Sequence, residues 1–281
     1  MTDHSTLYVV ATPIGNLADM TPRALQVLAE VDVIAAEDTR RSVQLLRHFN
    51  IETRLIAYHE HNEDRQLADL LGRLGRGETV ALISDAGTPL ISDPGYSLVR
   101  AVREDGHHVV PVPGVSSVIT ALSVAGLPTD RFSFEGFVPS KARAREKFYA
   151  GIIRQTQTLV CFETPHRLEA SLQALMAQAG PDRQIAICRE LTKTYEQVVA
   201  GGVAELLQLV KSGEIPQKGE IVLLITGEDH VPESSADTDH LLLELVKELP
   251  PSRAAALAAR ITGLPKRQLY ERALELHESA G

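Results

Sequence analysis

The sequence has few of the features that stabilise small secreted domains or anchor a chain in a membrane. Only two of its 281 residues are cysteines, Cys161 and Cys188, so a disulfide scaffold is excluded. Both lie inside apolar runs and no C-x-x-C spacing supports a redox pair, so we expect two buried strand residues. No stretch approaches the roughly 18 apolar residues of a membrane span, and residues 1–5 lack the pattern of a secretory signal. We therefore expect a cytoplasmic protein without a membrane partner.

Positive charge is also scarce. The chain has 28 Lys and Arg against 37 Asp and Glu, a net charge of −9, so we do not expect nucleic acid to coat the whole surface. Two segments depart from this balance, because residues 141–154 and residues 250–272 each carry five basic side chains and one acidic side chain. Each segment is either a solvated helix face or a local site for a polyanion.

Three common ligand motifs are absent. The loop after the first predicted strand contains Gly15 alone where a dinucleotide site needs G-x-G-x-x-G, so a Rossmann-type dehydrogenase or methyltransferase loop is excluded. The absence of G-K-[ST] excludes a P-loop NTPase. His59-Glu60-His61 resembles the start of the zinc motif H-E-x-x-H, but position 63 is Glu. We expect a polar loop end there and no metal site.

Apolar runs alternate with helical patterns along most of the chain. Strands are predicted at residues 7–11, 31–36, 55–58, 80–83 and 108–112, with helices between and after them. This alternation predicts a parallel α/β sheet in an N-terminal domain, residues 1–125. A second α/β pattern, residues 126–228, has strands at 132–134, 159–162, 185–188, 197–199 and 221–225.

The last part, residues 229–281, is predicted to be a linker and a helical tail. Residues 228–239 are polar and linker-like, and three short helices follow at 241–248, 253–261 and 266–276. The second and third helices are joined by Thr262-Gly263-Leu264-Pro265, which resembles a helix-turn-helix unit. The alternative is a helical cap that only packs on the rest of the chain. The concentration of basic residues favours docking on nucleic acid.

Two irregular loops follow predicted strands, at the edge where α/β sheets hold ligands. Residues 84–95 read S-D-A-G-T-P-L-I-S-D-P-G, and residues 112–117 read V-P-G-V-S-S. Gly87 allows close approach of a ligand and Asp85 offers a carboxylate, whereas the alternative is a long structural turn. Ser116 and Ser117 either cap the following helix or bind a polar ligand.

Together with A-T-P-I-G-N-L-x-D-x-T at the first loop, these motifs resemble the tetrapyrrole-methylase superfamily of S-adenosylmethionine-dependent enzymes. Further segments resemble one branch, the bacterial 16S ribosomal RNA ribose 2′-O-methyltransferases. They are A-A-E-D-T-R at 35–40, F-E-G-F-V-P at 134–139, F-E-T-P-H-R at 162–167, R-E-L-T-K at 189–193 and K-G-E-I-V-L at 218–223. One departure is Thr164, where the branch has Ser; the hydroxyl is kept.

The resemblance implies two α/β domains, a parallel-sheet N-domain and a mixed-sheet second domain, plus a small C-terminal helical domain. It also implies a homodimer that methylates the ribose of a cytidine in the decoding region of 16S ribosomal RNA, on the 30S particle. S-adenosylmethionine would bind in the cleft between the α/β domains. By resemblance, the residues that line it are Pro13, Asp85, Ala86, Gly87, Ile91, Ser116, Ser117, Phe162 and Leu191.

Charged residues follow three of the predicted strands. They are the catalytic candidates Asp38, Arg40, Glu163, His166, Arg167, Glu190 and Lys193. Because such loops gather around one mouth, we expect them to converge, with carboxylates accepting the hydroxyl proton and cations holding phosphates. The alternative for each is a salt bridge or helix cap, and the sequence leaves the base unassigned. Two other functions stay open: a tetrapyrrole methyltransferase and a non-catalytic ribosome-assembly binder.

Overall fold

The computed structural model describes residues 5–59, 61–228, 235–262 and 264–279. It divides into two compact units, of which the larger contains residues 1–153 and 157–226 and the smaller contains residues 154–156 and 227–281. Glu60 of the zinc-like motif, Gly263 of the predicted helix-turn-helix joint and residues 229–234 of the predicted linker lie outside the described residues.

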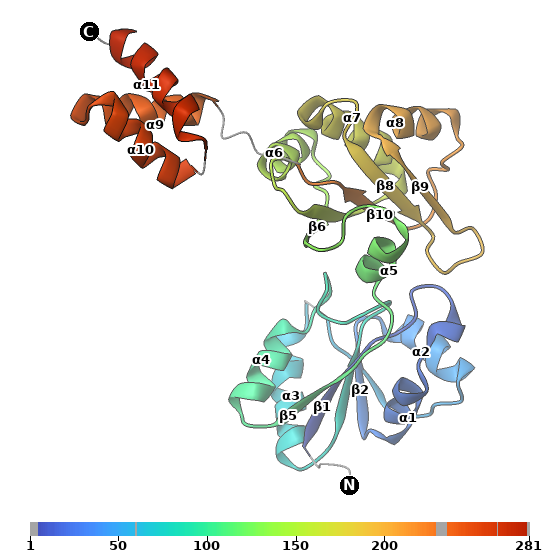
Figure 1. The fold of residues 1–281 in the computed structure, drawn as a ribbon. Coiled ribbons are helices and arrows are strands. Elements are labelled where there is room, and N and C mark those ends of the chain that lie inside the picture. The colour runs from blue at the N-terminus through green and yellow to red at the C-terminus, as the bar shows by residue number, and fades with distance from the viewer. Residues whose placement is uncertain (1–4, 60, 229–234, 263, 280–281) are drawn as a thin grey trace. The chain divides into compact units, whose positions relative to one another are not determined.

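The first sheet of the larger unit has five parallel strands in the order β3-β2-β4-β1-β5 (Figure 1). The strands are β1 (Thr6–Val10), β2 (Val33–Ala36), β3 (Leu55–Ala57), β4 (Val80–Ile83) and β5 (His108–Val112). One face packs on α1 (Pro22–Glu30) and α2 (Thr39–His48), and the other packs on α3 (Glu63–Gly75) and α4 (Tyr96–Glu104). The predicted parallel sheet is confirmed.

The loops that leave this sheet gather at one edge, because all five strands run in the same direction. After β1 the chain enters α1 on one face of the sheet, and after the neighbouring strand β4 it enters α4 on the opposite face. Adjacent strands whose connections diverge in this way open a crevice between their loops, which is the usual ligand position in such sheets.

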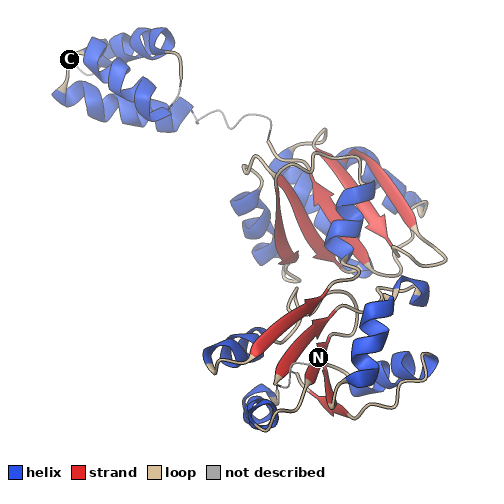
Figure 2. Cartoon of the chain, turned by 60° about the horizontal axis from the view of Figure 1, so that its bottom comes forward, coloured by secondary structure: helices blue, strands red, loops and turns tan. Residues whose placement is uncertain are grey.

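The second sheet is mixed and has the order β6-β7-β10-β8-β9 (Figure 2). Its strands are β6 (Phe132–Phe137), β7 (Thr158–Glu163), β8 (Gln184–Arg189), β9 (Gln197–Gly202) and β10 (Ile221–Ile225). Only β6 and β7 pair in parallel, and the other pairs are antiparallel. One face is covered by α6 (Ala142–Ile152), α7 (Leu168–Ala179) and α8 (Val203–Ser212). The mixed sheet that the resemblance implied is confirmed.

The opposite face of the second sheet is covered by α5 (Ser117–Val124), which leaves the first sheet directly after β5. Val118, Ala121 and Leu122 of α5 are buried against Val160 and Val222 of the second sheet. The helix therefore starts at the edge of one sheet and packs on the other. The domain boundary at residues 125 and 126 stays a prediction.

Several elements begin or end elsewhere than predicted. The short 3₁₀ helices η1 (Leu17–Asp19) and η2 (Pro165–Arg167) were not expected, because a single turn leaves no periodic pattern. β6 continues three residues past the predicted end at residue 134, through a register shift between Phe134 and Gly136. The described part of the tail begins as a helix at Ser235, so residues 235–239 are not linker. Polar residues in a first helical turn look like a linker in sequence, although they suit a helix start.

The smaller unit contains three helices, α9 (Ser235–Glu248), α10 (Pro251–Thr262) and α11 (Lys266–Ser279). They share a core that includes Leu242, Ala254, Ala258, Leu269 and Ala273. The predicted helical tail is confirmed. Within the described ranges, every helix is too short or too polar to cross a lipid bilayer.

Candidate functional site

Backbone hydrogen bonds tie together the loops that follow β1, β4 and β5. Thr12 and Gly87 exchange two of them, with N···O distances of 2.9 and 3.0 Å. The Thr12 hydroxyl donates to the carbonyl of Ser84 at 3.2 Å, and the Thr88 hydroxyl donates to the carbonyl of Val115 at 3.1 Å. The two ligand loops found in the sequence therefore form one structure with the A-T-P-I-G-N loop.

Positive backbone φ angles concentrate in two of the candidate loops. Leu90 and Ser92, in the loop after β4, have φ of 73° and 67°, and Glu190 and Thr192, after β8, have φ of 51° and 66°. A left-handed conformation costs an L-residue about 1–2 kcal/mol. Such strain persists only where the surroundings impose it, and it clusters at functional sites.

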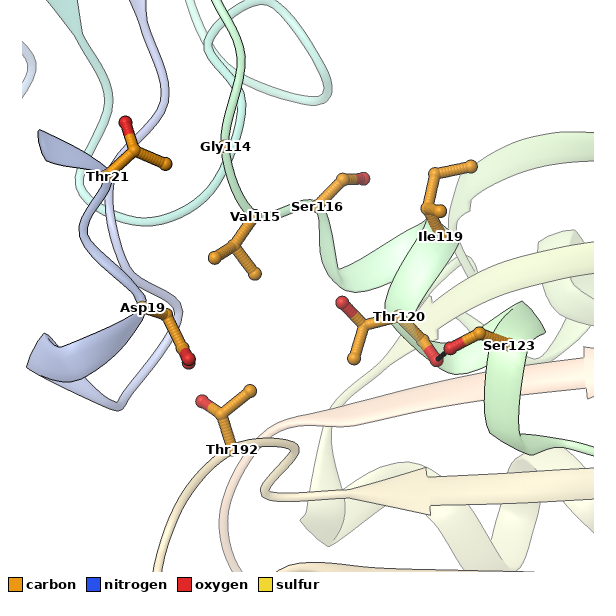
Figure 3. A pocket seen from close by; sticks show the side chains of 9 residues that line it. All are labelled: Asp19, Thr21, Gly114, Val115, Ser116, Ile119, Thr120, Ser123 and Thr192. Carbon is orange, nitrogen blue, oxygen red and sulfur yellow. Dashed lines mark hydrogen bonds between the residues drawn. The ribbon is translucent and has the colours of Figure 1, made fainter. Parts of the chain in front are cut away.

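An open cavity of about 610 Å³ lies between these loops and α5 (Figure 3). It is lined by Asp19, Thr21, Gly114, Val115, Ser116, Ile119, Thr120, Ser123 and Thr192. Four of these residues, at 116, 119, 120 and 123, follow the i, i+3, i+4, i+7 spacing of one helix face. The size matches that of pockets for small molecules and cofactors.

Ser116 precedes α5 as its N-cap residue, yet its side chain makes no capping hydrogen bond. The capping role that the sequence left open for Ser116 is therefore wrong. Ser116 instead lines the cavity (Figure 3).

Two polar atoms in the cavity wall have no partner among the described residues. Asp19 Oδ2 and Thr192 Oγ1 are both buried and make no hydrogen bond. None of the lining side chains is basic. The wall thus offers a carboxylate, several hydroxyls and the apolar Val115 and Ile119, a lining that suits hydroxyl groups and an apolar ring better than a phosphate.

Of the nine predicted cofactor-binding residues, Ser116 lines the cavity. Pro13, Gly87 and Leu191 are buried in the adjoining loops, Ser117 is half-buried, and Ala86 and Ile91 are exposed.

Asp85 is bound by the start of α2 and is not among the residues that line the cavity. Its Oδ1 accepts from the backbone N–H of Asp38 at 3.1 Å, and its Oδ2 accepts from Arg41 at 3.0 Å. Phe162 lies in an aromatic cluster, with ring centroids 4.8 Å from Phe134 and 5.2 Å from Phe137.

Asp38 and Arg40 pair with each other at the start of α2. Asp38 is the N-cap residue and accepts from the backbone and from the guanidinium of Arg40, at 2.9, 3.1 and 2.8 Å. Hydrogen bonds from the Arg40 side chain and backbone lower the pKa of Asp38 to about 2. This is the capping and salt-bridge arrangement that the sequence left open, and so acidic a carboxylate is a weak base.

Glu163 is fully buried, and β7 directs its side chain to the face that carries α6 and α7. It shares that face with Leu159 and Cys161, which pack against these helices. Its Oε1 accepts from the backbone N–H of Thr164 at 2.7 Å and lies 3.2 Å from Arg167 Nε. Arg167 Nε also donates to the Thr164 hydroxyl at 2.6 Å, while His166 is exposed.

Glu190 and Lys193 form an ion pair that is completed by Glu220. Lys193 Nζ lies 2.8 Å from Glu190 and 3.0 Å from Glu220, and the N–H of Glu220 donates to Glu190 at 2.9 Å. Burial alone would raise the pKa of Glu190, but these hydrogen bonds outweigh it and lower that pKa. Burial opposes the charge on Lys193, yet its two carboxylate partners outweigh this and raise its pKa.

Gly15 and Gly219 make room for this ion pair. A Cβ at Gly15 would overlap the Lys193 side chain, and one at Gly219 would overlap Glu190. The loop after β1 therefore touches the loop after β8. The Asp38 segment contacts Asp85 in the loop after β4, and the Lys193 segment contacts Gly15 in the loop after β1. Convergence of these two segments with the Glu163–Arg167 segment around one opening stays a prediction.

Most residues of the cavity wall were not predicted as site residues from the sequence. Asp19 and Thr21 are the D-x-T of the first quoted motif, and Thr192 is the T of R-E-L-T-K. Ile119, Thr120 and Ser123 continue the helix face that begins at Ser116. Their spacing was visible in the sequence, but only the packing of α5 shows which face remains open.

Comparison with protein families gives two matches along the chain. Residues 6–207 match the family described as Tetrapyrrole (Corrin/Porphyrin) Methylases. Residues 232–277 match the family described as RsmI C-terminal HTH domain.

Several bacterial proteins named ribosomal RNA small subunit methyltransferase I are similar over almost their whole length. The protein from Escherichia coli O157:H7 is 52% identical, covering 96% of this chain and 94% of that protein. The protein from Pseudomonas aeruginosa is 51% identical, covering 96% and 97%. The protein from Vibrio cholerae is 48% identical, covering 98% and 99%.

Solved structures with the same fold are more distant in sequence. A uroporphyrin-III-C-methyltransferase from Thermus thermophilus superimposes with a TM-score of 0.57 at 23% identity, covering 79% of this chain and 94% of that one. A diphthine synthase superimposes with a TM-score of 0.59 at 13% identity, covering 83% and 94%. At these identities the likeness establishes the fold.

Proposed function

Because this chain belongs to the tetrapyrrole methylase family, we propose that it transfers a methyl group from S-adenosylmethionine to ribosomal RNA of the small subunit. The observation that carries the proposal is identity of about half of all residues, over nearly the full length, to small subunit methyltransferase I from several bacteria. The similarity includes the helical tail, which matches a family of its own.

The finer proposal follows the motifs of the sequence. The acceptor is the ribose 2′-OH of a cytidine in the decoding region of 16S ribosomal RNA, on the 30S particle, and the enzyme is a cytoplasmic homodimer. R-E-L-T-K and K-G-E-I-V-L, which support this branch, form the Glu190–Lys193–Glu220 cluster beside the cavity.

The site suits catalysis by positioning. S-adenosylmethionine supplies an electrophilic methyl group on a sulfonium. The cavity wall would hold it through Ser116 and the loops around Gly87 and Leu191, with Val115 and Ile119 supplying apolar contact. Correct orientation of the two reactants contributes up to about 7–11 kcal/mol to such reactions. A ribose hydroxyl becomes accessible only in unstacked RNA, which exposed basic side chains such as Lys141, Arg143 and Lys147 would hold by its phosphates.

The decisive experiment follows radiolabelled methyl from S-adenosylmethionine into three acceptors: 30S particles, protein-free 16S ribosomal RNA and uroporphyrinogen. The 30S particles should come from cells that lack this methylation. We expect label in the 30S RNA, recovered after nuclease digestion as 2′-O-methylcytidine by mass spectrometry. Label in uroporphyrinogen alone would identify a tetrapyrrole methyltransferase. Binding to 30S particles without any transfer would identify an assembly factor.

A further inference from the structure

Of the carboxylates proposed as bases from the sequence, Asp38 and Glu190 are committed to other partners. Asp38 is held by Arg40, and Glu190 is held by Lys193 and the backbone of Glu220. Glu163 is paired through Oε1 and its Oε2 is buried without a partner among the described residues, but its side chain has no exposed surface and lies on the face of the sheet that packs on α6 and α7, opposite to α5. These three carboxylates are therefore poorly placed to take the proton of the methyl-acceptor hydroxyl.

Asp19 is the carboxylate that the cavity wall contains. Its backbone is fixed by its own turn, because its N–H donates to the carbonyl of Asn16 at 3.0 Å and the Asn16 side chain accepts from Ala18 at 3.1 Å. Its side chain plays no part in that turn, and Oδ2 is buried without a partner. A buried carboxylate oxygen left unpaired costs free energy, so its retention in a cavity wall indicates a bound donor.

Thr192 presents a second unpaired group from a different loop. Its Oγ1 is buried without a partner, and its backbone is held at a φ of 66° while its N–H donates to Glu196 at 2.6 Å. The neighbouring Lys193–Glu190 ion pair fixes this loop further. Figure 3 shows the side chains of Asp19 and Thr192 directed into the same part of the cavity, below Val115.

We propose that Asp19 is the general base for the ribose hydroxyl that accepts the methyl group, and that Thr192 orients the same ribose by a hydrogen bond. The inference rests on the proposed function. As the hydroxyl oxygen forms its bond to the methyl carbon, the bond from that carbon to sulfur breaks and its electron pair stays on sulfur. The hydroxyl proton passes to the Asp19 carboxylate, so charge and atoms balance.

The composition of the cavity wall favours a hydroxyl over other ligands at this position. A phosphate is disfavoured because the lining contains a carboxylate and no basic side chain. The part of the wall contributed by the loop after β5 is Gly114, Val115 and Ser116, which belongs to the motif expected to hold the cofactor. Asp19 and Thr192 come from the loops after β1 and β8, and neither is among the residues that the resemblance assigns to the cofactor.

The test compares Asp19→Asn with wild-type enzyme on 30S particles. Asn has the same shape but cannot take up the proton, and a positioned base contributes about 10²–10⁴-fold to such steps. We expect kcat to fall by at least about 100-fold, with unchanged affinity for S-adenosylmethionine by calorimetry and for 30S particles by filter binding. The matched control is Asp182→Asn, an exposed carboxylate on the approach to β8, which should behave as wild type.

The pH dependence separates a base from a structural residue. A general base gives the profile of kcat against pH an acidic limb, and this limb should be missing in Asp19→Asn. Asp19→Glu should keep the limb at a lower rate, and Thr192→Val should lower kcat while the limb stays. These two variants also test the assignment if Asp19→Asn fails to fold, as judged by circular dichroism.

Three outcomes would overturn the inference. If Asp19→Asn had the same kcat as wild type and kept the acidic limb, Asp19 would not be the base. Loss of S-adenosylmethionine affinity in Asp19→Asn would make Asp19 a cofactor contact. In these two cases the wild-type enzyme still methylates RNA, so the proposed function stands and only the role of Asp19 is wrong. The third outcome is a wild-type enzyme that methylates no RNA, which would overturn both the role of Asp19 and the proposed function.

Discussion

Carboxylates crowd together beside the loop after β4. Glu37, Asp85 and Asp93 lie close enough that Asp93 and Asp85 each raise the pKa of Glu37, after burial as the main cause. Arg41 neutralises one of them through its ion pair with Asp85. Burial raises the pKa of Asp93 to about 6, helped by the charge on Asp85 and opposed by a hydrogen bond from Ser84. Burial and mutual repulsion of these carboxylates therefore destabilise the folded state around the loop that was predicted to bind the cofactor.

Replacing Asp93 should reveal that cost in the stability of the fold. A carboxyl whose folded pKa is raised from 3.8 to about 6 favours its neutral form in the folded state. Its ionisation therefore removes stability as the pH rises through that interval, whereas at lower pH both states are protonated. We expect Asp93→Asn to raise Tm at about pH 8 and to leave it nearly unchanged at about pH 3, below both pKa values. Thermal unfolding by circular dichroism measures both.

Asp182→Asn serves as the control for this prediction, because that side chain is exposed. It should leave Tm unchanged at both pH values. An equal rise for Asp93→Asn at both pH values would mean that packing, and not ionisation, is responsible.

At the scale of elements, the strands were the most predictable part. β1, β4 and β10 are short apolar runs that end at polar or turn residues, and burial on both faces gives them an unbroken pattern. The start of α9 was missed because its first turn is polar, and η1 and η2 were missed because they are single turns. Local sequence records which face of an element is apolar, but not which neighbour covers it.

The candidate site shows the same limit. Gly87 and Ser116 were found because their loops directly follow predicted strands. Asp19 and Thr192 are more than 170 positions apart in the sequence, and they share a cavity only because α5 crosses to the second sheet. The sequence also does not show which side chain pairs with each predicted base, such as Arg40 with Asp38, because these pairs form only in the folded structure.

The loop after β4 can be tested by adding a side chain at Gly87. Gly87 has a φ of +83°, and a Cβ there would approach Ile14 Cγ2 at 3.3 Å and the carbonyl of Val115 at 3.8 Å. We expect Gly87→Val to abolish measurable S-adenosylmethionine binding in calorimetry, because the added methyl groups fill the approach to the cofactor loops. Gly213→Val is a matched control, since Gly213 has a φ of +85° and no atom within 4 Å of its Cβ.

Both variants bear the cost of a left-handed branched residue, so both should lose stability, Gly87→Val by more because its Cβ also crowds Ile14. Only Gly87→Val should lose cofactor affinity. If it bound S-adenosylmethionine as tightly as Gly213→Val does, the placement of the cofactor beside this loop would be wrong.

At the scale of the whole molecule, positive charge is distributed differently from the pattern the sequence suggested. Arg145, within the basic segment 141–154, is buried and donates to the carbonyl of Ser140 at 3.3 Å. Arg272 of the tail joins α11 to α9 through Asp239, with N···O distances of 2.8 and 2.6 Å, and also pairs with Glu275. These two arginines stabilise the folded structure, so fewer basic side chains are available to contact RNA phosphates.

The tail keeps exposed cations that have no ion pair among the described residues. Arg260 lies in the last turn of α10 and Lys266 begins α11, and both are exposed. The segment between the two helices resembles a helix-turn-helix turn in sequence. Arg267 beside them pairs only with Glu271 on its own helix, at 3.2 Å. Exposed cations at such a joint are placed to meet phosphates.

We therefore expect Arg260→Ala combined with Lys266→Ala to weaken binding to 30S particles and to flatten the plot of log affinity against log salt by about two units, one for each phosphate contact. Affinity for S-adenosylmethionine should not change. Arg272→Ala removes the same charge from a residue already bound to Asp239, so it should lower the stability of the helical tail while the salt slope stays that of wild type. Filter binding over a range of salt concentrations measures the slopes. If the double variant kept the wild-type affinity and slope, the tail would be a packing element, because a docking surface cannot lose two phosphate contacts without releasing fewer counterions.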